Sequence, residues 1–142
     1  MTSSIEKRIH HELKDYVHSI EYNDELIDVG FEYEDNYYIF SLNKYFPFVP
    51  PEKFYRNYIN INYTTTHIPF GLMDLYRKKY NICPCCQSLL CSINWTPAIK
   101  LLTIIQQYDC FRKDLIKLQK IRLFNKNTCL PDDITKIITS YI

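Results

Sequence analysis

Apolar residues recur with a helical period at the start of the chain. Ser3 and Glu6 have the spacing of a capping box, which marks the beginning of a helix. The apolar side chains after this box fall on one face of such a helix: Ile5, Ile9, Leu13, Tyr16, Val17 and Ile20. The pattern predicts an amphipathic helix over residues 3–20, with its charged side chains in solvent.

The period changes to two in the middle of the chain. Apolar and polar side chains alternate over residues 26–33, which predicts a half-buried strand. A turn at 34–36 and a second strand over 37–42 follow, and the Tyr-, Ile- and Thr-rich residues 55–67 predict a third β segment. Three prolines within residues 46–54 exclude a helix or a central strand there.

Helical patterns return in the C-terminal half. Residues 68–81 are predicted to form a loop with one helical turn. Thr96 and Pro97 have the spacing of an N-cap and the first residue of a helix, a further helix is predicted over residues 111–121, and Pro131 begins the last one. The first of these helices has an apolar stripe of Ala98, Leu101, Leu102, Ile105 and Tyr108. Strands flanked by helices at both ends predict an α+β fold with a small antiparallel sheet.

Length and composition limit the organisation of the chain. Its 142 residues are 46% hydrophobic, enough for one sizeable core, so we expect one domain over residues 1–126 and a helical appendix over 127–142. No apolar run approaches about eighteen residues, and the N-terminus is polar, so we expect a soluble, cytoplasmic protein with no membrane partner. Thirteen tyrosines and two glycines, with abundant Asn, Ile and Lys, resemble the composition of proteins from AT-rich large DNA viruses. Such a source implies the host cytoplasm or the virion.

Charge is balanced overall but unevenly distributed. A net charge of +1 argues against a general nucleic-acid binder, because affinity for phosphates depends on an excess of Lys and Arg. Residues 21–35 carry seven acidic groups and no Lys or Arg, whereas residues 112–126 carry six basic groups against the single Asp114. Two solvated faces of opposite sign are the simplest interpretation, and a dedicated partner site is the alternative.

Four of the six cysteines fall within nine positions. In a reducing compartment such crowding favours thiolate chemistry or metal binding over a disulfide framework, and the adjacent Cys85 and Cys86 cannot easily form an unstrained disulfide. Cys83 and Cys86 form a C-x-x-C pair that is typical of zinc ligands, to which Cys91 and His67 would add two more. A redox dithiol would require a parallel βαβ unit, which the pattern does not show. Small buried thiols are the remaining interpretation.

Several motifs in order resemble the ubiquitin-conjugating enzyme (UBC) family. The family has a Tyr-Pro-Phe-x-Pro-Pro segment after its third strand, and residues 46–51 here read FPFVPP. It has a Trp-Ser-Pro-Ala segment that opens the helix after the catalytic cysteine, and residues 95–98 here read WTPA. Residues 6–15, EKRIHHELKD, are similar to the family's first helix. The resemblance covers residues 4–108 and implies a UBC-like α+β fold.

The resemblance also implies partners. Phe48, Pro97 and Ala98 match the surface through which the family meets ubiquitin ligases. Lys7 and Arg8, on the first helix, would face the activating enzyme. Ubiquitin or a ubiquitin-like protein would be the cargo. These five residues are therefore the candidate partner-binding positions.

The catalytic position is assigned by resemblance alone. Residues 86–90, CQSLL, are similar to the family's cysteine-containing strand, which makes Cys86 the candidate nucleophile that would carry ubiquitin as a thioester to a lysine. The family's His-Pro-Asn tripeptide is missing: His67 offers only a partial match, and the segment from it to Cys83 is longer than usual. One strand before Phe46 is also expected to be absent. The alternatives are therefore a divergent conjugating enzyme and a catalytically silent UBC-fold binding or scaffold module, the latter with structural zinc in the cysteine cluster.

The last thirteen residues have a separate resemblance. Residues 130–142, LPDDITKIITSYI, are similar to the opening helix of F-box motifs, which dock on adaptors of cullin ligases. Asp132 and Asp133 lie where they would favour the positive end of the helix dipole. An ordinary helix packed on the domain is the alternative.

Overall fold

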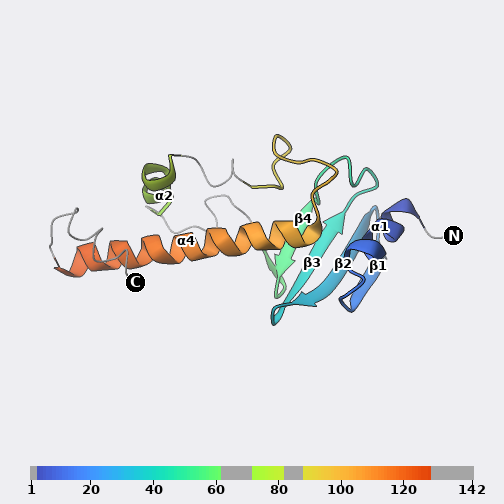
Figure 1. Cartoon of the computed structure of the whole chain (residues 1–142), viewed down its shortest axis with the longest axis horizontal. Coiled ribbons are helices and arrows are strands. Elements are labelled where there is room, and N and C mark those ends of the chain that lie inside the picture. Colours follow the sequence, from blue (N-terminus) through green and yellow to red (C-terminus); the bar gives the residue numbers. More distant parts are fainter. Residues whose placement is uncertain (1–2, 62–71, 82–87, 129–142) are drawn as a thin grey trace.

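The computed structural model describes residues 3–61, 72–81 and 88–128 (Figure 1). Within these ranges, an N-terminal helix precedes a run of strands, and two helices follow them. In chain order the elements are α1 (Ser4–Glu12), β1 (His18–Asn23), β2 (Leu26–Tyr33), β3 (Asn36–Leu42), β4 (Lys53–Arg56), β5 (Ile59–Asn60), α2 (Leu72–Tyr80) and α4 (Leu101–Thr128). The predicted α+β class, with helices at both ends of an antiparallel sheet, is confirmed.

The strands form a meander in which each pairs antiparallel with its neighbours in sequence, in the order β1-β2-β3-β4-β5. Two-residue turns join β1 to β2, β2 to β3 and β4 to β5. Glu34 and Asp35 both have positive φ, at 48° and 66°, as do Asn57 and Tyr58, at 50° and 67°. Positive φ at both central residues is the backbone of a type I′ hairpin, whose twist matches that of the strands it joins.

The inner face of the sheet holds the main core. Phe40 pairs with Val29 of β2 and with Phe54 of β4, and the rings of Phe40 and Phe54 stack with their centroids 4.7 Å apart. Helix α1, its C-cap residue and helix α4 cover this face with five fully buried side chains, Ile9, Leu13, Leu101, Ile104 and Ile105. Trp95 is also buried against this core.

A second, smaller core lies farther along α4. Leu72 and Tyr76 of α2 pack against Phe111 and Leu118 of α4, all four buried. Figure 1 shows α4 crossing the sheet and continuing well beyond it to meet α2. One helix of 28 residues therefore belongs to both cores.

The first predicted helix is shorter than its pattern indicates. Ser3 does cap α1, with its Oγ accepting from the Glu6 N–H at 3.2 Å, but the helix ends at Glu12. Residues 18–23 form β1 instead, and Ile20 pairs with the buried Val29. Helical and strand periods coincide over these few residues, and pairing with β2 decides between them. The expectation of a missing strand before Phe46 is therefore wrong.

The C-terminal helices also differ from prediction. The loop predicted over residues 68–81 contains a nine-residue helix, α2, stabilised by its apolar contact with α4. The helix predicted to start at Pro97 begins at Leu101, because residues 96–99 form a turn in which the Ile99 N–H donates to the Thr96 carbonyl at 3.1 Å. The two helices predicted up to residue 121 are one, since no Gly or Pro interrupts α4. The helix predicted from Pro131 lies outside the described residues.

No helix among the described residues is both long enough and apolar enough to cross a bilayer. The long α4 carries charged side chains along its distal half.

Alkaline pH should weaken the contact between α2 and α4. Burial, then the hydrogen bond and charge of Asp114, raises the pKa of Tyr80 to about 12. An unfolded tyrosine ionises near pH 10, so between about pH 10 and 12 the unfolded chain binds fewer protons than the folded one, and stability falls as pH rises. The stabilisation from this hydroxyl is complete below about pH 10.

We expect Tyr80→Phe to flatten the fall in melting temperature between about pH 10 and 12, measured by circular dichroism. The fall should be reduced and not abolished, because burial also raises the pKa of Tyr38, Tyr76 and Tyr108. An unchanged slope in the variant would contradict the assignment.

Candidate docking site

The proline-rich loop between β3 and β4 presents one aromatic ring to solvent and buries another. Phe46 is 2% exposed and packs in the main core, whereas Phe48, two residues later, is 79% exposed. The bond between Phe46 and Pro47 is cis. Turn hydrogen bonds close the loop: the Phe46 N–H donates to the Asn43 carbonyl at 3.1 Å and the Phe48 N–H to the Tyr45 carbonyl at 2.8 Å. Phe48 thus projects from a loop with an anchored backbone.

A second loop, residues 88–100, supports the first. The indole Nε1 of Trp95 donates to the Pro47 carbonyl at 2.8 Å, and its ring lies 6.0 Å from that of Phe46. The Cys91 carbonyl accepts from the backbone of Asn94 and Trp95, at 2.9 and 3.1 Å. The buried indole is therefore held by its own loop while it fixes the proline-rich one. Trp95 thus packs in the main core and holds the proline-rich loop at the same time.

An ion pair on α1 connects these loops to both helices. Arg8 Nε donates to Glu12 Oε2 at 2.8 Å, and Arg8 Nη2 donates to the Ile99 carbonyl at 2.9 Å. The guanidinium also lies over the ring of Phe46, 5.3 Å from its centroid. The other oxygen of Glu12 accepts from the Leu101 N–H at 2.8 Å, at the first turn of α4. A carboxylate there satisfies an otherwise unpaired donor and favours the positive end of the helix dipole.

The partner-binding residues expected from the resemblance lie on the two loops and on α1, which these contacts hold together. Phe48, Pro97 and Ala98 are exposed, and Trp95 links their two loops. Lys7 is exposed on α1. Arg8 differs: its guanidinium is occupied by Glu12, Ile99 and Phe46, so its observed contacts position the loops. Its predicted contact with the activating enzyme remains a prediction.

Most of the predicted catalytic and zinc-binding residues lie outside the described residues. This holds for Cys83, Cys86 and His67. Cys91 is described, as a half-buried free thiol. Within residues 3–61, 72–81 and 88–128, no three His, Cys, Asp or Glu side chains gather as a metal site would require. The catalytic role of Cys86 and the zinc site therefore remain predictions.

Glu12 is the residue of this site that sequence reasoning missed. Its spacing from Arg8, i to i+4, indicates a helical ion pair and could have been recognised. Its contact with Leu101 spans 89 positions, and no local pattern predicts it.

Comparisons with protein-family models, curated proteins and solved structures found no match for this chain.

Glu12→Ala should weaken the contacts that join α1 to the start of α4 and to the two loops. The Glu12 side chain is 6% exposed, so its removal leaves the Leu101 N–H without its acceptor and leaves the Arg8 guanidinium with only the Ile99 carbonyl and the Phe46 ring. We expect the free energy of unfolding to fall by about 1–3 kcal/mol, measured by urea denaturation. Asp15→Ala, at an exposed carboxylate just after α1, is the matched control and should change it by less than about 0.5 kcal/mol. Equal effects of the two variants would remove the bridging role.

Proposed function

We propose that this chain is a UBC-like docking domain of the ubiquitin pathway, which binds a ubiquitin ligase through Phe48, Pro97 and Ala98. The observation that carries the proposal is the position of Phe48. Its ring is 79% exposed on a loop pinned to Trp95, whereas the neighbouring Phe46 is buried. A large aromatic side chain held in solvent by an anchored backbone is typical of an interface anchor.

The energetics favour such an anchor. Transfer of one phenyl side chain from water into an apolar pocket contributes about 1.5–3 kcal/mol. Because turn hydrogen bonds and the Trp95 contact already fix the loop, little additional backbone order is required on binding. Pro97 and Ala98 add small exposed apolar groups on the loop that holds Trp95.

The order of elements also supports a UBC-like domain. A helix, an antiparallel meander, the FPFVPP loop, the Trp95 loop and a long helix follow one another. The strand that the sequence pattern missed removes one of the departures from the family. Lys7 is the exposed cation on α1 that would meet an activating enzyme.

Two versions of this function differ in chemistry. A conjugating enzyme would carry ubiquitin on the thiol of Cys86, whereas a silent module would dock partners without forming a thioester. The docking surface is common to both, so we propose it as the shared function.

Phe48→Ala should weaken ligase binding without unfolding the domain. We expect at least about a tenfold loss of affinity for a purified ubiquitin-ligase domain selected from a panel by calorimetry, as removal of one aromatic anchor predicts. Val17→Ala removes another strongly exposed apolar side chain, on the connection from α1 to β1, and should leave the affinity unchanged. If Phe48→Ala binds as wild type does, Phe48 is not the anchor.

A ubiquitin-charging assay distinguishes a conjugating enzyme from a silent binding module. The chain is incubated with activating enzyme, ATP and ubiquitin, and a reductant-sensitive adduct is sought on a gel. An ATP-dependent adduct that Cys86→Ser abolishes would identify a conjugating enzyme, because a thioester forms only after ATP activates ubiquitin, requires the thiol and is cleaved by reductant, whereas a disulfide forms without ATP. No adduct from a folded chain, with several modifiers tried, would identify a silent binding module.

A further inference from the structure

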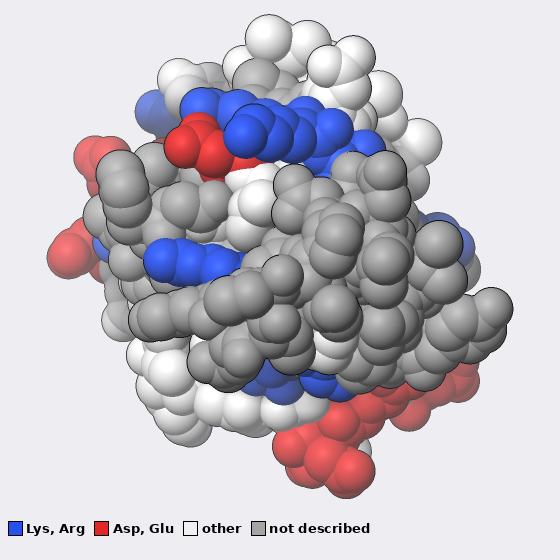
Figure 2. Space-filling view, turned by 90° about the vertical axis from the view of Figure 1, so that its left-hand side faces the viewer, with Lys and Arg blue, Asp and Glu red and all other residues white. Residues whose placement is uncertain are grey.

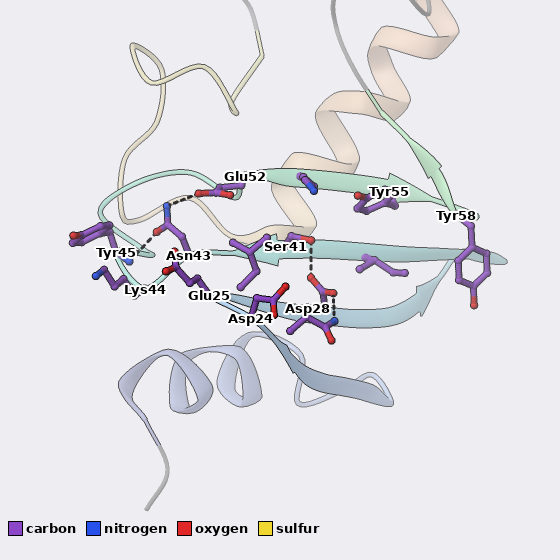
Figure 3. A pocket seen from close by; sticks show the side chains of 14 residues that line it. Asp24, Glu25, Asp28, Ser41, Asn43, Lys44, Tyr45, Glu52, Tyr55 and Tyr58 are labelled. Atoms are coloured by element: carbon purple, nitrogen blue, oxygen red, sulfur yellow. Dashed lines mark hydrogen bonds between the residues drawn. The ribbon is translucent and has the colours of Figure 1, made fainter.

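The outer face of the sheet is acidic and is not covered by α1 or α4. Val29 and Phe31 face the core, so the alternating residues of β2, including Asp28, face outward. A hollow of about 1080 Å³ lies on this face. Figure 3 shows its lining side chains in front of the strands, with α4 behind them. The charged lining residues are Asp24, Glu25, Asp28 and Glu52, with Lys44 and Lys53.

One carboxylate in this hollow is held in place. Asp28 accepts from Ser41 Oγ at 2.6 Å and from Asn23 Nδ2 at 2.7 Å, and Ser41 is itself buried. Glu21 lies directly opposite Asp28 on β1, so two negative side chains share a cross-strand pair, which is unfavourable on its own. Among the described residues, none of the seven carboxylates of residues 21–35 forms an ion pair. The face is therefore arranged to receive positive charge.

The solvent side of distal α4 carries that charge. Lys113, Lys117 and Lys120 follow at i, i+4 and i+7, which places them on one stripe of the helix, and all three are exposed. Ile116 and Leu123 flank the stripe at 46% and 53% exposure. Figure 2, seen from the α2 and α4 end, shows Lys and Arg side chains in several places there, while the largest group of Asp and Glu side chains lies at the lower right edge.

These two surfaces cannot meet within one molecule. The proximal half of α4 packs on the inner face of the sheet through Leu101, Ile104 and Ile105, opposite the acidic face. The helix is about 42 Å long and carries the lysines away from the sheet (Figure 1). Among the described residues, none of these three lysines forms an ion pair, so they are available to the carboxylates of a second molecule.

We propose that a second copy of this chain docks the Lys113, Lys117 and Lys120 stripe of its α4 onto the acidic outer face formed by Glu21, Asp24, Glu25 and Asp28. Charge complementarity identifies the occupant, because both surfaces belong to the same chain and a net charge of +1 leaves little mutual repulsion between copies.

Apolar groups match as well. Exposed Ile116 and Leu123 of the stripe would meet the apolar part of the hollow, which Leu26, Ile39 and Tyr55 line. The contact joins two different surfaces, so it is heterologous and generates closed rings or open chains.

Charge reversal at both surfaces tests the proposal. Glu21→Lys/Glu25→Lys reverses the acidic face, and Lys117→Glu/Lys120→Glu reverses the stripe; all four side chains are exposed, and circular dichroism checks that each variant folds. Sedimentation equilibrium of the full chain measures self-association. We expect wild type to associate at about 0.02 M salt and to dissociate at about 0.5 M, where the Debye length is only a few ångströms.

Each reversed variant alone should self-associate at least tenfold more weakly than wild type. An equimolar mixture of the two should associate again, because the acidic face of one variant meets the lysine stripe of the other. Lys14→Glu/Lys100→Glu changes two exposed lysines outside the stripe by the same charge and should behave as wild type.

A wild-type chain that stays monomeric at low salt would overturn the proposal. Reversed variants that associate as wild type does, or a mixture that stays monomeric, would overturn it as well. The inference does not depend on the ubiquitin pathway, since Phe48→Ala should leave self-association unchanged.

Discussion

A buried carboxylate joins the first helix of this protein to the long helix that follows 89 positions later. Glu12 accepts a hydrogen bond from the backbone of Leu101 and pairs with Arg8, which in turn reaches Ile99 and covers Phe46. A charge with this little exposure is tolerated only when it is paired and hydrogen-bonded, and here both oxygens are used. The first turn of α4 is joined to α1 directly by this contact, and the proline-rich loop is joined to it through Arg8 and Phe46.

Helix α4 connects the Glu12 contact to both hydrophobic cores. Its first turns cover the inner face of the sheet, and its later turns form a second core with α2. Because no Gly or Pro interrupts it, the helix is continuous from the Glu12 contact to the lysine stripe. The proline-rich loop and the basic end of α4 are consequently connected through one continuous helix.

Sequence reasoning succeeded where the relevant interactions are local. Alternation identified β2, the turn signal at 34–36 and the residues after it identified β3, and the capping box located the start of α1. It failed at β1 because the apolar spacing of residues 13–20 fits a helix, and only the hydrogen bonds to β2 decide the outcome. It misplaced the start of α4 for the same reason, since Thr96 and Pro97 resemble a helix start locally while the carboxylate that caps the helix comes from Glu12.

The candidate site likewise combines residues that local motifs indicated with residues that only long-range contacts place there. Motifs alone indicated Phe48, Pro97 and Ala98, and the structure finds each of them exposed. The groups that hold them, Glu12 and the Pro47 carbonyl, could not be predicted because they act through contacts between distant segments. The two proposed surfaces also differ in physical character. An aromatic anchor gains free energy from apolar burial and should be nearly insensitive to salt, whereas docking of the lysine stripe should weaken steeply as the Debye length shrinks. Salt dependence alone therefore indicates which surface holds a bound partner.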